Sequence, residues 1–487
     1  MDKAIVAPEA SIVQRRCSVS LPESAQRARG VCRQYRIGMA VVVWFRRDLR
    51  LRDQGSLAAA AAAGETVVPL FVLDPQLWPR VGQRRRDRLA ASLHSLDQSI
   101  KEWGGSGLVV RTGEPQQVLL DVCREVEADS VIHSAEFTPY GKLRDDQVGE
   151  ELTAAGISFE PADSPFLHPP GEVLTGSGAG YSVFTPYYKS WSARQTPEPL
   201  ETVELSFDTS TAGESLPDIS TPMSAGEERA LGILQAFVND GLTAYGSKRN
   251  RPDQDATSHL GAALHFGELH PRTVVAAARE VGGEAFIRQL CWRDFYGDVL
   301  SRLPQARNEN VDRRFDAIPW VTGTDADAAF ERWSSGMTGY PFVDAGMRQL
   351  VHTGWMHNRV RMVVASFLTK DLLLHWRRGA AFFSEQLLDA DVANNALGWQ
   401  WTAGTGTDAA PYFRVFNPVL QGLKFDPDGD YVRRFVPELA HLKGAQVHEP
   451  WKVSDGYSHG YPERMVDHAE AREEALRIYE SVKTATR

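Results

Sequence analysis

The sequence predicts an α/β domain with a doubly wound parallel sheet, joined by a long linker to an all-helical domain. Three observations support this prediction. Strand-like apolar runs alternate with helical stretches over the first third of the 487 residues, an acidic and proline-containing stretch follows, and the remainder is dominated by helical periodicity. A chain of this length has room for two or three domains.

The amino-terminal third supplies the predicted sheet. Strand-like runs occupy residues 41–45, 67–73, 108–110, 130–133 and 157–159. Helical stretches occupy residues 56–63, 85–103, 115–128 and 142–155 between them. Because each strand is followed by a helix that can cross back over the sheet, this order predicts parallel strands.

The boundary between the predicted domains lies in a stretch of unusual composition. Residues 195–228 contain eight acidic residues and no Lys or Arg. Its prolines are Pro197, Pro199, Pro217 and Pro222. Such a composition is typical of a solvated linker. We therefore predict an α/β domain over residues 39–165, a linker over 166–228 and a helical domain over 229–487.

The helical prediction rests on long stretches with a period near 3.6 residues. They cover residues 273–281, 285–301 and 342–374, with an interruption near Gly354. Strand-like runs are not found among them, which predicts an almost entirely helical second domain.

Residues 1–38 fit neither domain. They are rich in arginine and lack strand periodicity. A targeting peptide is one reading, but Asp2, Glu9 and Glu23 and the lack of an apolar core weaken it. We favour a disordered extension or an upstream start.

Composition limits the classes of protein that fit. No apolar run approaches about eighteen residues, so the sequence predicts a soluble protein without a membrane partner. Four scattered cysteines argue against a disulfide scaffold and a structural zinc site, and favour a reducing cytoplasm. We expect no metal site. The net charge of -10 means that any affinity for nucleic acid must come from a local basic patch.

The most informative stretch runs from Asp389 to Pro418, with the sequence DADVANNALGWQWTAGTGTDAAPYFRVFNP, because it combines acids, amides, two tryptophans and an arginine with few large aliphatic residues. Acids and amides interrupt its apolar periodicity repeatedly. Buried polar groups need partners, so this region predicts a ligand site. A solvated loop is the alternative, but Trp399 and Trp401 argue against it.

Three motifs resemble the photolyase and cryptochrome family, and they span residues 40–440. VVVWFRRDLRLRD begins at Val41, GWMHNRVRM begins at Gly354, and TGTDAAPYFRVFNP begins at Thr405. The last is most similar to class I cyclobutane pyrimidine dimer (deoxyribodipyrimidine) photolyases. The resemblance implies a light-driven carbon–carbon lyase that repairs UV-damaged DNA. It also implies a monomer without an obligate protein partner, cytoplasmic and associated with the nucleoid when bound to DNA.

The resemblance further implies a bound FAD in the helical domain. The residues implied on the phosphate and ribose side are Tyr245, Thr257, Ser258, Leu260 and Gly261. Those implied on the ring side are Gln289, Arg293, Asn358, Arg361, Asp389, Asp391 and Asn395. Arg361 and Asp389 are expected to form a buried pair, and Asn395 is expected near the flavin N5. Outside this context, a helix-surface ion pair would be the favoured reading of the Arg and Asp residues.

Three tryptophans match the photoreduction chain of the family: Trp399, Trp376 and Trp320, in order from the flavin to the surface. The indole ring is readily oxidised, which suits electron hopping. Most large aromatic side chains simply fill cores, so this assignment rests on the motif match.

A lesion pocket and a DNA-binding surface are implied in the same way. Trp292, Asn358, Met362 and Trp401 match residues that hold the flipped dimer, where aromatic faces can stack on the pyrimidines. The cationic side chains expected around the pocket are Lys248, Arg249, Arg251, Arg359 and Arg414. Charge runs are more often only solvated faces, but Arg249, Arg359 and Arg414 match family DNA contacts.

The implied mechanism is cyclic electron transfer from excited, reduced FAD to the dimer and back, with no net redox change. One residue departs from the family pattern. Gln289 stands where cyclobutane dimer photolyases present a glutamate to the thymine carbonyls. An amide can donate and accept hydrogen bonds but cannot supply a proton, so we expect binding to persist and repair to be less efficient.

Two alternatives remain. Glutamine at this position also occurs in photolyases for the 6-4 photoproduct, but that group expects paired histidines, and here His357 is followed by Asn358. A cryptochrome-type light sensor with little repair activity is the stronger alternative. It usually carries a long carboxyl-terminal tail, whereas the chain after Pro437 is short and looks helical over residues 462–482.

The amino-terminal domain of this family often holds a second, light-harvesting chromophore. Pro139, Tyr140 and Gly141, followed by Arg144 and Asp145, resemble the pattern of deazaflavin-binding relatives. We therefore expect a deazaflavin rather than a methenyltetrahydrofolate, although an empty pocket would also be compatible with the sequence.

Overall fold

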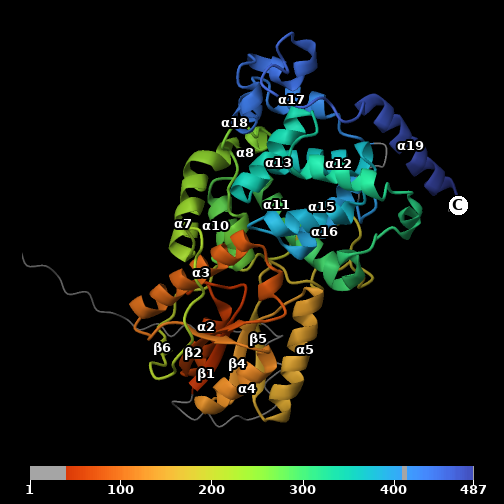
Figure 1. The fold of residues 1–487 in the computed structure, drawn as a ribbon. Helices are drawn as coiled ribbons and strands as arrows, with labels where there is room; N and C mark the ends of the chain where they lie inside the picture. Colours follow the sequence, from red (N-terminus) through yellow and green to blue (C-terminus); the bar gives the residue numbers. More distant parts are fainter. Residues whose placement is uncertain (1–39, 409–413, 486–487) are drawn as a thin grey trace, which may run out of the picture. The chain divides into compact units, whose positions relative to one another are not determined.

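A computed structural model describes residues 40–408 and 414–485. The predicted amino-terminal extension lies outside this range. The first part of the described chain forms a parallel sheet with strands β1 (Ala40–Phe45), β2 (Thr66–Leu73), β3 (Val109–Thr112), β4 (Ser130–Ser134), β5 (Ser158–Asp163) and β6 (Ser206–Phe207). The helices around it are α2 (Gly55–Ala63), α3 (Gln83–Glu102), α4 (Pro115–Glu125) and α5 (Pro139–Ala154). Figure 1 shows this α/β domain in red to orange, apart from β6, which is yellow-green.

The strand order is β3-β2-β1-β4-β5, and every pairing is parallel. The order reverses at β1, as in a doubly wound sheet. This confirms the predicted fold class. Alternate residues of β1 face opposite sides: Val41 and Val43 pack with α2 and α3, whereas Val42 and Trp44 pack with α4 and α5. Both faces of the sheet are therefore covered.

The rest of the described chain is helical, as predicted. Its helices are α7 (Glu227–Ala236), α8 (Leu242–Lys248), α9 (Gly261–Phe266), α10 (Pro271–Glu280), α11 (Glu284–Arg302), α12 (Thr324–Ser334), α13 (Pro341–Thr353), α14 (Asn358–Ser366), α15 (Trp376–Gln386), α16 (Val392–Ala403), α17 (Pro418–Phe425), α18 (Asp430–Phe435) and α19 (His468–Ala485). The interruption expected near Gly354 separates α13 from α14, because Gly354 ends α13 with φ of 71°.

The predicted linker is more ordered than its composition suggests. It contains helix α6 (Phe184–Ala193), whose Phe184, Tyr187 and Trp191 are buried in the core of the helical domain. It also contributes β6, which pairs with Thr66 and Val67 of β2. The acidic composition holds for residues 195–228, which follow α6, and even there Glu227 is buried and accepts hydrogen bonds from the backbone N of Leu51 and of Arg52. The exact domain boundaries remain predictions.

Buried ion pairs join the α/β domain to the helical domain. Arg88 of α3 makes a bidentate pair with Glu268, with N–O distances of 2.6 and 2.5 Å. Arg272 of α10 bonds to Asp53 and, at 2.8 Å, to Asp163. Removing one partner from such a pair leaves a buried charge uncompensated, so these contacts favour a fixed arrangement of the two domains.

Candidate functional site

Asp391 caps helix α16, which carries much of the polar segment singled out in the sequence. Its Oδ1 accepts a hydrogen bond from the backbone N of Asn394 at 3.0 Å, and its Oδ2 lies 2.8 Å from Nη2 of Arg47, just after β1. Burial opposes the ionisation of Asp391, but Arg47 and Arg293 outweigh it and hold the pKa of Asp391 below its ordinary value. Asp391 is therefore a buried anion shared between the two domains.

Asn395 lies one turn further along α16. Its Nδ2 donates to the backbone oxygen of Ala380 and to Oγ of Ser384, both at 2.8 Å. Since α15 takes both amide protons, Oδ1 is the atom left to accept a hydrogen bond from a ligand.

Arg361 and Asp389 approach each other as predicted. Nη2 of Arg361 lies 3.4 Å from both carboxylate oxygens of Asp389, while its Nε donates to the backbone oxygen of Met356 at 2.7 Å. Both side chains keep some exposure, 26% and 15%, so the pair is less buried than expected. A Cβ on Gly261, the first residue of α9, would collide with the Asp389 carboxylate, which places α9 against this pair.

The predicted phosphate and ribose residues lie around the start of α9. Thr257 and Ser258 are half-buried in the preceding loop, and Oγ of Ser258 accepts from the backbone N of Leu260 at 3.4 Å. Tyr245 is buried on α8, and its hydroxyl interacts with Arg249. These hydroxyls and backbone amides are donors of the kind that binds phosphate.

His357 is a buried group that the sequence reasoning did not assign to this site. Its Nδ1 accepts from the backbone N of Arg359 at 3.1 Å and caps α14, so Nε2 carries the proton. Nε2 is buried and has no hydrogen-bond partner among the described residues. Burial, together with Arg361 and Arg359, lowers the pKa of His357 to about 4, so the ring is neutral at pH 7. An unpaired buried donor favours a ligand acceptor.

Arg293 points toward the α/β side of the molecule. Its Nη2 donates to the backbone oxygen of Leu264 at 3.2 Å, and its guanidinium lies 4.9 Å from the ring of Phe166. The positive charge of Arg293 also helps to lower the pKa of Asp391. Arg293 is therefore positioned to act on the site electrostatically.

Of the three predicted electron-transfer tryptophans, the one expected nearest the surface is the most exposed. Trp399 and Trp376 are buried, at 3% and 1% exposure, whereas Trp320 is half-buried. The indole of Trp399 abuts Gly379 of α15, one turn from Trp376. The ring of His375 lies 5.7 Å from that of Trp376 and 5.1 Å from that of Trp320. The described structure thus brings Trp376 and Trp320 to the same histidine.

A cavity of about 710 Å³ brings together three of the predicted lesion and DNA residues, Trp292, Trp401 and Arg249. Trp292 lies on α11, Trp401 on α16, and Arg249 at the end of α8. Arg249 and Trp401 are more than 150 residues apart in the sequence. Asn358 and Met362 lie on α14, exposed and half-buried respectively, and are not part of the cavity lining.

Three predicted DNA-binding arginines lie close enough for two of their charges to act on the third, Arg359. Burial lowers the pKa of Arg359, and the neighbouring charges of Arg414 and Arg249 lower it further. Arg359 also donates to Oδ1 of Asn250 at 2.8 Å. Such mutual repulsion is relieved by an anion, which makes this cluster a candidate phosphate site. Lys248 is exposed, whereas Arg251 pairs with Asp253.

Gln289 lies half-buried on α11, one turn before Trp292. Its Nε2 lies 3.4 Å from the backbone oxygen of Ala285 on the same helix. This weak contact leaves the amide available to a ligand, but Gln289 does not line the cavity that holds Trp292.

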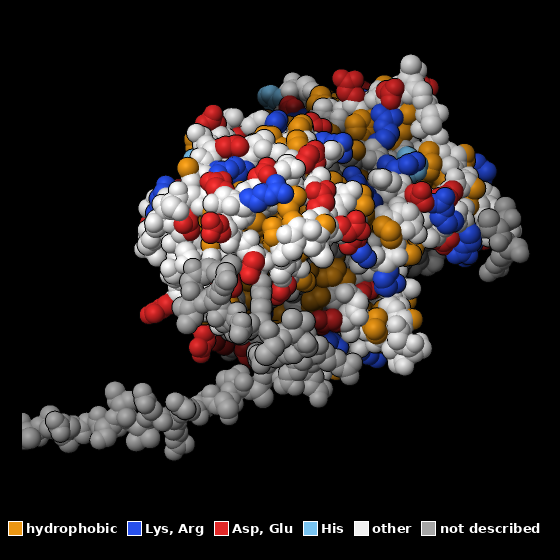
Figure 2. Space-filling view, turned by 90° about the horizontal axis from the view of Figure 1, so that it is seen from below, with side chains coloured by type: hydrophobic (Ala, Val, Ile, Leu, Met, Phe, Trp, Pro, Cys, Tyr) orange, Lys and Arg blue, Asp and Glu red, His pale blue; other side chains and the backbone are white. Residues whose placement is uncertain are grey.

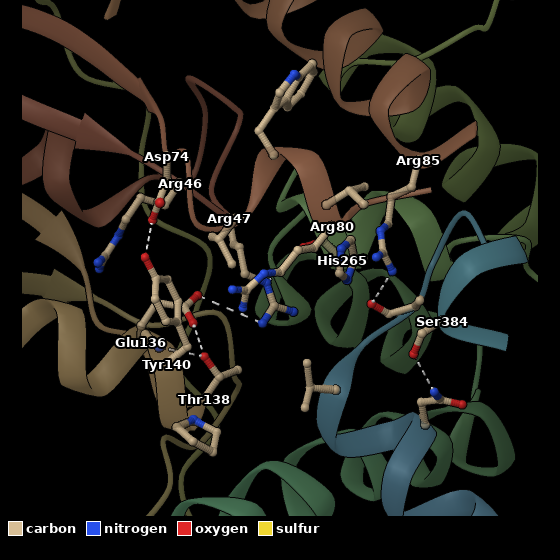
Figure 3. Close-up of a pocket in the computed structure, with 18 of the residues that line it drawn as sticks. Arg46, Arg47, Asp74, Arg80, Arg85, Glu136, Thr138, Tyr140, His265 and Ser384 are labelled. Atoms are coloured by element: carbon tan, nitrogen blue, oxygen red, sulfur yellow. Dashed lines mark hydrogen bonds and ion pairs between the residues drawn. The ribbon is translucent and has the colours of Figure 1, made fainter. Parts of the chain in front are cut away.

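A second cavity, of about 680 Å³, lies between the two domains (Figure 3). The α/β domain contributes Trp44, Arg46, Tyr140, Gly141 and Arg144, and the helical domain contributes Asn395 and Ser384. The hydroxyl of Tyr140 donates to Oδ2 of Asp74 at 2.5 Å, and the guanidinium of Arg144 lies 4.8 Å from the ring of Trp44.

Cationic side chains dominate the middle of this cavity. Figure 3 shows Arg47 and Arg80 near each other beside His265, with Arg46 to one side and Arg85 to the other. Oε1 of Glu136 lies 3.9 Å from Nη1 of Arg47. Burial and Arg47 lower the pKa of His265 well below its ordinary value, so this ring is neutral. The lining therefore suits a planar ligand with an anionic group.

The face seen in Figure 2 has acidic and basic side chains intermixed. Its Lys and Arg side chains do not merge into one continuous basic surface there. No group of three or more His, Cys, Asp or Glu residues suited to a metal ion occurs among the described residues. Within those residues, no helix has the length and apolar character needed to cross a bilayer.

Comparisons with known proteins cover both domains. The family model described as DNA photolyase matches residues 41–204, and that described as FAD binding domain of DNA photolyase matches residues 286–481. A deoxyribodipyrimidine photo-lyase from Agrobacterium fabrum is 38% identical over 480 residues, which cover 92% of this chain and 98% of that protein.

Two solved structures are similar over almost the whole chain. A bacterial class III photolyase from Agrobacterium tumefaciens superposes with a TM-score of 0.86 at 37% identity and covers 93% of this chain and 100% of its own. An archaeal photolyase from Sulfolobus tokodaii with two FAD molecules superposes with a TM-score of 0.82 at 31% identity and covers 91% and 100%.

Proposed function

Because the chain belongs to the DNA photolyase family, we propose that it uses light to split cyclobutane pyrimidine dimers in UV-damaged DNA. The observation that carries this proposal is the cavity shared by Trp292, Trp401 and Arg249. Two indole faces suit stacking on an extruded pyrimidine pair, and a guanidinium at the same cavity suits its phosphate.

The polar residues around α9, α14 and α16 fit FAD. His357 offers an unpaired buried N–H, Asn395 offers Oδ1 as an acceptor, and Ser258 offers a hydroxyl at the start of α9. Thr257, Leu260 and Gly261 complete the loop that would hold the phosphates, with Tyr245 behind it. Reduced FAD, when bound, supplies under illumination the electron that opens the cyclobutane ring.

The residues around that cofactor have distinct tasks. Arg361 and Asp389 would orient its ring side, and Asp391 would contribute a fixed negative charge held by Arg47. Asn395 would accept a hydrogen bond at the ring without imposing a charge, because both of its amide protons are already used. Gln289 and Asn358 would contact the cofactor or the dimer from α11 and α14.

Trp399, Trp376 and Trp320 would carry electrons from the surface toward the cofactor when it must be reduced. Trp399 and Trp376 are buried and Trp320 is half-buried, which suits Trp320 as the ring nearest the surface. The indole N–H of Trp376 donates to Oδ1 of Asn310 at 2.8 Å, which fixes the middle ring.

DNA would be held by the arginine cluster and the lesion cavity. The charges of Arg249 and Arg414 both oppose that of Arg359 in the free protein, so a phosphate bound beside Arg359 would relieve that repulsion. Lys248 would add an exposed charge beside them. Met362 would contribute apolar contact from α14.

The part of the inter-domain cavity that the α/β domain lines would hold a second chromophore, whereas its Asn395 side belongs to the proposed flavin site. Arg46, Arg144 and Trp44 offer a stacked cationic wall, and Tyr140 lies beside them. We favour a deazaflavin over a folate, on the residues that follow Pro139. An absorption spectrum of the purified protein identifies the chromophore directly. We further propose a cytoplasmic monomer that associates with the nucleoid through damaged DNA.

The proposed function is tested with an oligonucleotide that contains one thymine dimer. Purified protein with reduced FAD should restore the undamaged strand under blue light and not in the dark, as measured by chromatography. An oligonucleotide with a 6-4 photoproduct should remain unrepaired. Dimers that persist under illumination, with reduced FAD bound, would rule the proposal out.

A cryptochrome-type light sensor is the second candidate, and Gln289 is the observation that favours it. The residue offers an amide where the family's repair enzymes present an acid. Under that alternative the protein would undergo the same photoreduction but would split few dimers per photon absorbed.

A further inference from the structure

An aromatic column leads away from the proposed lesion site. The rings of Trp292 and Phe184 are stacked, with centroids 3.7 Å apart and planes 8° from parallel. The ring of Tyr188 continues the stack, 6.0 Å from Phe184 at 21°. Phe184 is buried, whereas Tyr188 is half-buried and lines the same cavity as Trp292 and Trp401. The column therefore links Trp292 through buried Phe184 to a second half-buried aromatic face, that of Tyr188.

Arg288 of α11 covers this second face. Its guanidinium carbon lies 4.8 Å from the ring centroid of Tyr188 and 5.4 Å from that of Phe184. Arg288 is exposed and lines the cavity. A guanidinium stacked on an aromatic ring keeps its edge free for a phosphate while its face is held in place.

The usual helix partner does not hold this arginine. Glu284 lies four residues earlier on α11, in the position that favours a Glu–Arg pair, yet no ion pair forms between them in the described structure. The other acid of the cavity, Asp408, instead accepts a hydrogen bond from the backbone N of Phe184 at 3.1 Å. Arg288 therefore keeps its charge available at the cavity.

We propose that Tyr188 and Arg288 form a subsite for the unpaired base, with its phosphate, that neighbours the dimer on the damaged strand. This inference rests on the proposed function and extends it beyond the dimer itself. When a dimer leaves the helix, the adjacent base loses its stacking partner, and a half-buried aromatic ring can replace it. The arginine supplies the matching charge for the connecting phosphate.

The test compares binding of strands that differ only in the base beside the dimer. One is a single-stranded hexanucleotide with a central thymine dimer, and the others carry an abasic sugar immediately 5′ or 3′ of it. For the unaltered protein, one abasic strand should bind about tenfold more weakly. Tyr188→Ala should bind the complete strand about tenfold more weakly than the unaltered protein does. Its affinities for the complete and the abasic strands should then be equal, as a double-mutant cycle measures.

Conservative variants separate stacking from charge. Tyr188→Phe should retain the preference for the complete strand, because it keeps the ring. Arg288→Lys keeps the charge but not the planar group, so it should recover only part of the affinity lost in Arg288→Ala. Arg124→Ala, which removes an exposed arginine of α4, is the matched control and should leave the preference unchanged.

The isolated thymine dimer dinucleotide provides the decisive comparison. Tyr188→Ala should bind it as tightly as the unaltered protein does. If Tyr188→Ala weakens binding of the dinucleotide and of the hexanucleotide equally, the subsite proposal is overturned. It is also overturned if the variant melts at a lower temperature but keeps the preference for the complete strand, because Tyr188 then serves only the packing of α6 on α11. If the unaltered protein does not prefer dimer-containing strands, the proposed function fails and the subsite with it.

Discussion

The guanidinium of Arg47 lies 2.8 Å from the carboxylate of Asp391, which joins the end of the first strand to the cap of the helix that carries Asn395 and Trp399. The two residues are 344 positions apart. Nε of Arg47 also reaches the backbone oxygen of His265 at 3.2 Å. The α/β domain thus supplies the counter-ion for a helix of the proposed flavin site.

Replacing Arg47 should therefore weaken cofactor retention. In Arg47→Gln, Asp391 loses its strongest cationic neighbour while remaining buried, which should cost about 2 kcal/mol of folding free energy. The ratio of FAD to protein after gel filtration should fall, and urea unfolding should report the lost stability. Arg124→Gln removes an exposed arginine and should change neither measurement.

The middle tryptophan should control photoreduction without controlling repair. In Trp376→Phe, light-driven reduction of oxidised FAD should be lost, because the ring between Trp399 and the surface is harder to oxidise. Repair by chemically reduced protein should remain. Flavin absorbance under illumination measures the first effect, and Trp103→Phe, at the C-cap of α3, is the remote control. Unchanged photoreduction would show that Trp376 is not part of the route.

The amide at position 289 should limit repair rather than binding. Gln289→Glu restores a group that can carry a proton near the dimer, so the number of dimers split per photon should rise. The Kd for dimer-containing DNA should change by less than about threefold, equivalent to about 0.6 kcal/mol. A Kd that changes while the yield stays constant would contradict this assignment.

The arginine cluster should determine the salt dependence of DNA binding. Arg359→Ala removes one proposed phosphate contact, so the slope of log K against log salt should become shallower by about one unit. Undamaged and damaged DNA should be affected equally. Titrations between about 50 and 200 mM salt measure the slope. An unchanged slope would mean that Arg359 does not contact phosphate.

A buried carboxyl should make stability fall with rising pH. Burial raises the pKa of Asp371 to about 6, although His468 partly opposes this. Between about pH 4 and 6 the folded protein keeps a proton on Asp371 that the unfolded chain has released, so its stability falls as pH rises through that window. The effect amounts to at most about 3 kcal/mol.

Asp371→Asn should remove this contribution. Urea unfolding at several pH values should show a smaller decrease between about pH 4 and 6 than in the unaltered protein. The same slope in Asp371→Asn and the unaltered protein would contradict the proposed protonation.

The strands and long helices could be predicted because their patterns are local. The periodicity of residues 41–45 or 285–301 depends only on which face is buried. The flavin and tryptophan assignments came from motifs and remain predictions, although Arg361 and Asp389 do meet. Arg47 escaped notice as a site residue because its partner Asp391 is distant in sequence. His357 could not be assigned to the site from the sequence, because its unpaired Nε2 becomes evident only once the structure shows that Nδ1 caps α14.

The linker was misjudged for a related reason. The linker prediction over residues 166–228 was drawn from the acids and prolines of residues 195–228, whereas a few aromatic residues before that stretch determine its packing. Phe184 and Trp191 are buried with the helical domain although their surroundings are polar. An average over such a segment hides the side chains that fix its position.

The pairing of β6 with β2 affects how the protein could be divided. β3 pairs with β2 from Leu70 onward, and β6 pairs with the same edge at Thr66 and Val67. A fragment that stopped at residue 165 would lack β6 and would therefore leave the backbone of β2 at Thr66 and Val67 unpaired on this edge. Exposed strand edges recruit other strands, so such a fragment should self-associate when expressed alone. The α/β domain is a complete module only when it retains the chain through Phe207.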